Sequence, residues 1–123
     1  MEINKKLLNN QIQQDYTSGG NAVKCGYKID NKDVYVKRIN FGSLPNTTSK
    51  SVTTGIDFSN HTLIKIEGIG KYQGNNIALP LPYSHPTRLD FNIMVNIDAS
   101  NNLVVTTGTD RSSTKGYFNI YYI

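Results

Sequence analysis

The segment that decides the fold alternates apolar and polar side chains: Phe91-Asn92-Ile93-Met94-Val95-Asn96-Ile97-Asp98. A period of two places successive side chains on opposite faces of a β-strand, so this pattern predicts a strand with one core face and one mostly polar face. The turn residues 99–102 follow it, and residues 103–107 return as the expected hairpin partner.

Strands of the same kind are predicted on both sides of this hairpin. We expect them near 23–29, from about 33 to 41, around 63–67 and over the closing residues 116–123. Turn residues separate them, and three prolines keep residues 79–88 extended or at a sheet edge. Short strands with no helix-length segment between them predict an all-β fold, an antiparallel β-sandwich that is jelly-roll-like.

The amino-terminal segment has a helical pattern instead. Its apolar residues recur every three to five positions within 1–15, at Ile3, Leu7, Leu8 and Ile12. A helix this short is marginal alone in water, so it needs its own domain or copies of itself to pack against. Residues 17–21 read as a flexible break. We therefore expect a helical lead-in with its break, 1–21, and a β-sandwich domain, 22–123.

The composition argues against several classes of function. The chain has 123 residues, one Cys, two His and a formal net charge of +4. Lys and Arg are spread from Lys5 to Lys115 without forming a stripe, so we expect no nucleic-acid partner. Cys25 cannot form an intrachain disulfide and is expected to be buried as a small apolar side chain. No apolar run has membrane-spanning length, so we expect no membrane insertion.

The sequence shows no pattern of catalytic or metal-ligating residues. It contains no CxxC, HExxH or Gly-x-Ser-x-Gly motif. Glu67 is the one acid within a predicted strand and is expected to face solvent. The other acids lie in or beside turns, where capping of backbone amides explains them: Asp30, Asp33, Asp57, Asp90, Asp98 and Asp110. We predict that the protein is not an enzyme and has no cofactor and no metal.

Three loops favour a binding function. Segments 70–76 and 83–88 combine aromatic rings with amides, a His and an Arg, and 108–113 is a third candidate. Such loops on a rigid β scaffold form recognition surfaces, whereas loops that do not converge are ordinary solvated turns. The candidate ligand-binding residues are Tyr72, Gln73, Asn75, Asn76, Tyr83, His85, Arg88 and Arg111.

The closing strand has aromatic side chains on both faces. One face is expected to meet the core, and the other meets either a neighbouring subunit or further parts of the same domain. Both interpretations stay open. The candidate subunit-interface residues are Tyr117, Tyr121 and Ile123, together with the apolar residues of the lead-in, Ile3, Leu7, Leu8 and Ile12.

Several motifs resemble those of tail-fibre and baseplate-associated receptor-binding proteins of tailed phages. Residues 29–37 read Ile-Asp-Asn-Lys-Asp-Val-Tyr-Val-Lys and residues 42–46 read Gly-Ser-Leu-Pro-Asn, followed by Lys50 and Gly55-Ile56. Further similar segments are 64–68, 79–82, 107–112 and the Tyr-rich end. The sequence departs from that group at Lys28, Asn31 and Asp33, where Trp, Gly and Pro are usual, but Asn31 preserves a turn because Asn tolerates positive φ.

The resemblance implies a virion protein at the phage tail or capsid surface, assembled in the host cytoplasm as a homotrimer beside other virion proteins. It also implies a host-surface receptor, a glycan or a protein. Our leading hypothesis is a trimer that binds a host glycan through its end loops. Two alternatives stay open: a purely structural virion domain (head fibre, capsid decoration or baseplate assembly) without a host ligand, and a free-standing carbohydrate-binding module.

Overall fold

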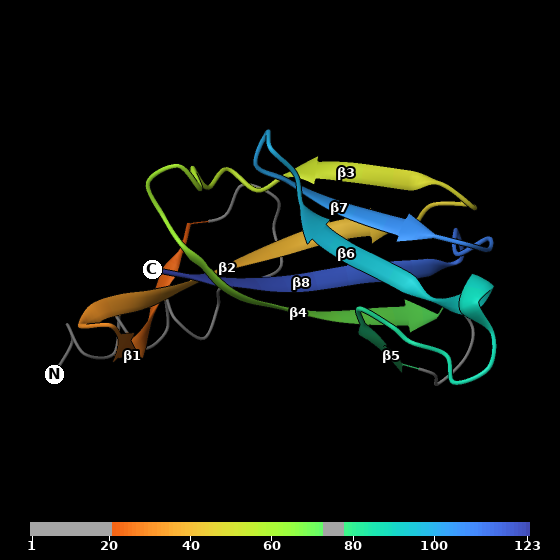
Figure 1. The fold of residues 1–123 in the computed structure, drawn as a ribbon, viewed down its shortest axis with the longest axis horizontal. Coiled ribbons are helices and arrows are strands. Elements are labelled where there is room, and N and C mark those ends of the chain that lie inside the picture. The colour runs from red at the N-terminus through yellow and green to blue at the C-terminus, as the bar shows by residue number, and fades with distance from the viewer. Residues whose placement is uncertain (1–20, 73–77) are drawn as a thin grey trace, which may run out of the picture.

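The computed structural model describes residues 21–72 and 78–123. They are nearly all β (Figure 1), with the elements β1 (Val23–Ile29), β2 (Lys32–Ser43), β3 (Ser49–Thr53), β4 (Leu63–Tyr72), β5 (Ala78–Leu81), the 3-10 helix η1 (Leu89–Phe91), β6 (Ile93–Ile97), β7 (Asn102–Thr107) and β8 (Thr114–Tyr122). No helix in these two ranges is long and apolar enough to cross a membrane.

The strands form two antiparallel sheets, one of five strands in the order β1-β2-β8-β4-β5 and one of three in the order β3-β7-β6. In Figure 1 the long strands β2, β8 and β4 run side by side through the molecule, with β3, β7 and β6 along one side. The predicted all-β, antiparallel fold is confirmed, and the arrangement is that of a β-sandwich.

The core lies between the two sheets. Phe118 and Ile120 of β8 and Leu103 and Val105 of β7 are buried in one apolar cluster, although they come from different sheets. Burying a side chain of this size stabilises the fold by about 1.5–3 kcal/mol. Only alternate residues of each strand point into this core. The two-residue alternation of apolar residues therefore gives each sheet one apolar face, and the two apolar faces pack together.

The hairpin turns use residues that accept a left-handed backbone. Asp30 and Asn31 have φ of 51° and 61° and form the two-residue connection between β1 and β2. Positive φ at both positions matches the right-handed twist of the flanking strands. In the β6–β7 turn, Asn101 has φ 64°, and Asp98 accepts bonds from the backbone N–H groups of Ser100 and Asn102, both at 2.9 Å.

The closing strand β8 is the central strand of the large sheet. Phe118, Ile120 and Tyr122 face the core, while Tyr117 and Tyr121 lie half-buried on the opposite face, which we call the outer face. Ile123 is half-buried and exchanges two backbone hydrogen bonds with Thr62. The prediction of one core-facing side is thus confirmed, and the role of the other side stays a prediction.

Three details differ from the sequence analysis. No strand was expected at β3, because Ser49–Thr53 is mostly polar and shows no alternation of apolar residues. The strand expected from Phe91 begins at Ile93, because Phe91 ends the 3-10 turn η1. Cys25 is half-buried, not buried, because β1 is an edge strand that is covered on one side only. The predicted lead-in helix, with Ile3, Leu7, Leu8 and Ile12, lies outside the described residues. β1 begins at Val23, close to the expected start of the domain.

Four Asp side chains that accept hydrogen bonds in turns make the free energy of unfolding depend on pH. Bonds to Ser59, Arg88, Asn102 and Ser112 respectively lower the pKa of these carboxyls below the usual value of 3.8: Asp57, Asp90, Asp98 and Asp110. A folded-state pKa below the unfolded one contributes stability at higher pH, and this contribution is lost as pH falls through the folded-state pKa. We expect the melting temperature to stay level from pH 7 to about 5 and to fall below pH 4.

Thermal melts followed by circular dichroism test this expectation. Asp98→Asn serves as the matched variant, because an amide oxygen accepts the same two backbone bonds but does not titrate. At pH 7 the melting temperature of the variant should stay near that of the unmodified protein. Below pH 4 the melting temperature of the variant should decrease less than that of the unmodified protein. A melting temperature that rises on acidification would contradict the assignment.

Candidate functional site

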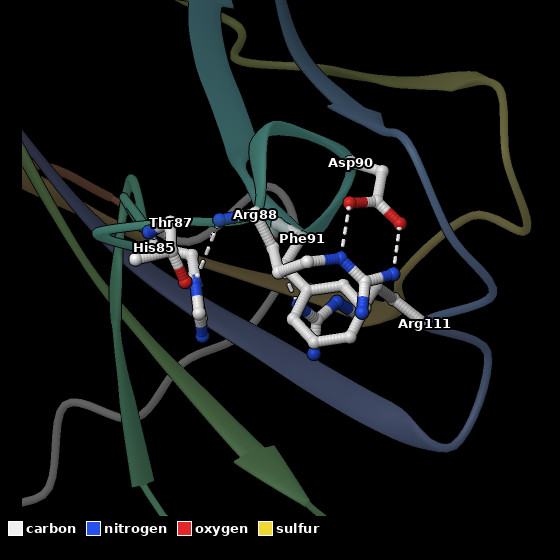
Figure 2. Close-up of polar contacts among 6 residues, drawn as sticks. All are labelled: His85, Thr87, Arg88, Asp90, Phe91 and Arg111. Carbon is white, nitrogen blue, oxygen red and sulfur yellow. Dashed lines mark hydrogen bonds and ion pairs between the residues drawn. The ribbon is translucent and has the colours of Figure 1, made fainter.

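Two connections meet at one end of the sandwich. They are residues 82–92, between β5 and β6, and residues 108–113, between β7 and β8. Ring contacts join three of the side chains that they bring together, Tyr83, His85 and Phe91. The guanidinium groups of Arg88 and Arg111 lie over these rings, and Figure 2 shows them with His85 and Phe91. We call this group the loop-end cluster: Tyr83, His85, Arg88, Phe91 and Arg111.

The first connection is positioned by a sheet contact. Tyr83 and Ile93 exchange backbone hydrogen bonds of 3.0 Å and 2.9 Å, so the chain leaves β5 of the large sheet and pairs beside β6 of the small one. Pro80 on β5 is compatible with this position because an edge strand can lack one donor. The backbone on both sides of the connection is therefore fixed by the scaffold.

His85 is held in one tautomer by the backbone. Its Nδ1 accepts hydrogen bonds from the N–H groups of Thr87 at 3.2 Å and Arg88 at 3.0 Å (Figure 2). A nitrogen that accepts carries no proton, so the proton of the neutral imidazole is on Nε2. The ring edge also contacts Phe91, with centroids 5.2 Å apart. His85 thus caps the turn with one nitrogen and keeps the other as a donor.

Arg88 and Asp90 form a planar, bidentate pair. Arg88 Nε donates to Asp90 Oδ1 at 3.0 Å, and Nη2 donates to Oδ2 at 2.7 Å. The guanidinium lies over the ring of Phe91, 4.2 Å from its centroid. The hydrogen bonds from Arg88 also hold the pKa of the Asp90 carboxyl below its usual range. Both side chains are about half exposed, which leaves their outer edges open to a ligand.

Arg111 joins the second connection to the first through a hydrogen bond and two contacts with aromatic rings. Its Nη2 donates to the carbonyl oxygen of Phe91 at 2.7 Å, and its guanidinium lies 5.7 Å from the ring centroids of both Tyr83 and Phe91. Its Nε is buried and has no hydrogen-bond partner within the described residues. Arg111 is therefore mainly a positioning residue, which holds the two aromatic rings and η1 in place.

Gly108 allows the two connections to approach this closely. A Cβ atom on Gly108 would lie 2.6 Å from the carbonyl oxygen of Asp90 and 3.0 Å from its Cα. Both are backbone atoms and cannot rotate away. The contact between the two connections thus requires a residue without a side chain at position 108.

The structure brings together four of the eight predicted ligand residues, Tyr83, His85, Arg88 and Arg111. Tyr72 lies at the same end of the sheet, paired with Thr114, but has no described ring contact or hydrogen bond with the cluster. Gln73, Asn75 and Asn76 lie outside the described residues. The convergence of two loops that the binding hypothesis requires is therefore present.

Sequence reasoning missed three residues of this end. Phe91 was assigned to the strand because it fits the alternation, and Asp90 was explained as a turn cap. Leu89 is 83% exposed at the tip of η1, next to Arg88. The spacing of Arg88 and Asp90 around an apolar residue in a short turn was the signal available for all three.

The loop-end cluster combines polar and apolar groups on one surface. It offers donors on Arg88 and His85, aromatic edges and an exposed apolar side chain. An open pocket of about 350 Å³ lies alongside, lined by Tyr83, Asn92 and Met94 among others. No group of three or more His, Cys, Asp or Glu that could hold a metal ion occurs within the described ranges. Comparisons with protein-family models, curated proteins and solved structures found no match.

Proposed function

We propose that this chain is a phage virion protein of the tail-fibre or receptor-binding type, which binds a host-surface receptor, a glycan, and is not an enzyme. The observation that carries the proposal is the convergence of Tyr83, His85, Arg88 and Arg111 at one end of a rigid sandwich. The motifs in residues 29–56 that resemble such virion proteins add to it.

The chemistry of the loop-end cluster suits a saccharide. Sugar rings present apolar C–H faces and several hydroxyl groups, which pair with aromatic surfaces and with fixed donors and acceptors. The Arg88–Asp90 pair offers donors and acceptors in one plane, and His85 Nε2 adds a further donor. Because His85 is held by backbone N–H groups and Arg88 and Asp90 hold each other, little conformational entropy is lost when a ligand binds.

We further propose that the protein assembles as a homotrimer. Within the described residues, the edge strands β1 and β3 have no strand on their open sides, and closed symmetry would cover such edges. Tyr117 and Tyr121 face a surface on which cations outnumber acids, so two copies of that surface would repel each other. We therefore place the subunit contacts at the sheet edges and at Ile123, with the lead-in residues of the sequence prediction.

The finer description of the fold as jelly-roll-like belongs with this proposal. It is supported by the crossings of the chain from one sheet to the other between β2 and β3, between β3 and β4, between β5 and β6, and between β7 and β8. The virion location and the partner virion proteins rest on the resemblance alone.

Arg88→Ala is expected to lower glycan affinity by roughly 30-fold or more, because it removes the central planar donor and leaves Asp90 unpaired. A glycan array identifies the saccharide, and titration calorimetry with it measures the loss. Lys28→Ala serves as the control, since Lys28 is exposed beside the β1–β2 turn at the opposite end.

Equal binding by the Arg88→Ala variant and the unmodified protein would contradict the loop-end site. An array without any saccharide preference would favour the structural virion domain. The mass in solution at low micromolar concentration separates the third possibility, because a free-standing carbohydrate-binding module should be a monomer.

A further inference from the structure

The outer face of the large sheet gathers positive charge that is dispersed in the sequence. In the described part of the chain this face carries one acid, Glu67, and five cations that come from three adjacent strands, β2, β4 and β8: Lys32, Arg38, Lys65, Lys71 and Lys115. The entire chain has a formal net charge of only +4. Alternation places Lys32 and Arg38 on one side of β2, and Lys65 and Lys71 on one side of β4, because the two members of each pair are an even number of positions apart. The register of β8 with β2 and β4 brings these sides together and adds Lys115.

Two of these cations stand directly opposite each other. Lys71 of β4 pairs in register with Lys115 of β8, and both are exposed. Like charges at directly opposed positions destabilise a sheet. The opposed lysines therefore do not stabilise the sheet. A polyanion that contacts both ammonium groups would compensate their mutual repulsion. The neighbouring pair on the same face is Ile69 with Tyr117, and Ile69 is 50% exposed.

A pocket lies further along the same face. It has a volume of about 490 Å³, and its lining includes Arg38, Lys65, Glu67 and Tyr121, with Tyr27 from β1. The Glu67 carboxylate already has two partners. Its Oε1 lies 3.8 Å from Lys65 Nζ, and the carboxylate accepts a hydrogen bond from the Tyr121 hydroxyl, which raises the pKa of that phenol. An acidic group that enters the pocket thus meets cationic side chains beside a carboxylate that is already compensated.

Lys65 also lies over the ring of Tyr121, 4.6 Å from its centroid. This contact covers one face of an aromatic ring on which a nucleic-acid base would otherwise stack. At this position the surface therefore offers a ligand an ammonium group and not an uncovered aromatic face. This arrangement favours a saccharide polymer with charged substituents over a single-stranded nucleic acid.

We infer that the outer face of the large sheet binds an acidic polysaccharide, with one acidic unit in the pocket at Arg38 and Lys65 and others at Lys71 and Lys115. Lys65 and Lys71 are six residues apart on β4, which corresponds to roughly 20 Å along a strand. The ligand must therefore be an extended chain with several negative charges. This site is separate from the loop-end cluster and does not depend on the function proposed for it.

The test uses a fluorescent heparin-derived oligosaccharide as the acidic probe, dextran as the neutral polymer and single-stranded DNA as the competing polyanion. The full chain should bind the acidic probe, with an affinity that falls as salt concentration rises, and should not bind dextran. The double variant Lys71→Gln with Lys115→Gln should lose about tenfold in affinity or more. The Arg88→Ala variant should bind the probe as the unmodified protein does.

The matched control is Lys28→Gln, compared with Lys115→Gln. Each removes one charge from an exposed position, but Lys28 pairs with Asp33, which lies on the opposite side of β2 from Arg38, so Lys28→Gln should leave the affinity unchanged whereas Lys115→Gln should lower it. Equal losses in the two single variants would show attraction by net charge alone and would overturn the inference. Absence of binding, or tighter binding of DNA than of the oligosaccharide, would overturn it as well.

Discussion

Leu103→Ala is expected to lower the free energy of unfolding by about 2–5 kcal/mol. Leu103 has no exposed surface and lies in the core cluster on β7, the central strand of the small sheet. Its neighbours are held in two hydrogen-bonded sheets, so they cannot collapse into the cavity that the substitution leaves. Urea denaturation followed by circular dichroism measures the change, provided that the slope with denaturant stays constant.

Leu89→Ala is the matched control for this variant. It removes the same atoms from a side chain that is 83% exposed, so the free energy of unfolding should change by no more than about 0.5 kcal/mol. Similar losses in the two variants would show that Leu103 does not lie in the core. Leu89 also lies at the tip of η1, so its replacement would lower glycan affinity without a loss of stability if the receptor covers this tip.

Gly108→Ala is expected to abolish glycan binding at the loop end and to lower the free energy of unfolding by roughly 1–3 kcal/mol. The new methyl group would overlap the backbone of Asp90, so the two connections must move apart. The 2.7 Å bond from Arg111 to the carbonyl oxygen of Phe91 then breaks, and the Arg88–Asp90 pair loses its position. Titration calorimetry and urea denaturation measure the two effects separately.

Gly26→Ala separates loss of the site from loss of stability. Gly26 has φ 86°, where Ala is strained by about 1–2 kcal/mol, but a Cβ atom there meets nothing within 4 Å. This variant should therefore be destabilised to a similar degree and still bind the glycan. If both variants kept full affinity, the loop-end cluster would not be the glycan site.

Much of the candidate site was predictable because polar aromatic loops are local in sequence. The segment 83–88 was recognised from its composition, and Arg111 from its place in a turn. What the sequence did not show is that Arg111 faces inward and donates to Phe91, or that Gly108 touches Asp90. These contacts join residues about twenty positions apart, and only the packing of the two sheets sets their distance.

The outer-face cations illustrate the same limit. Arg38, Lys65, Lys71 and Lys115 are dispersed along the chain, and dispersion in sequence was taken as a sign of ordinary solubility. The pairing of β8 with β2 and β4 brings them to one surface. Charge patterns within a strand are visible in the sequence, but charge patterns across strands depend on register.

The sequence by itself determined most of the strands other than β3, the main turns and many of the core side chains, because these properties depend on neighbours one to four positions apart. Only the tertiary structure decided that β8 is central, that two loops meet at one end and that positive charge gathers on one face. The physical reason is that strand order and register depend on how distant segments satisfy each other's hydrogen bonds and apolar surface, which no local pattern specifies.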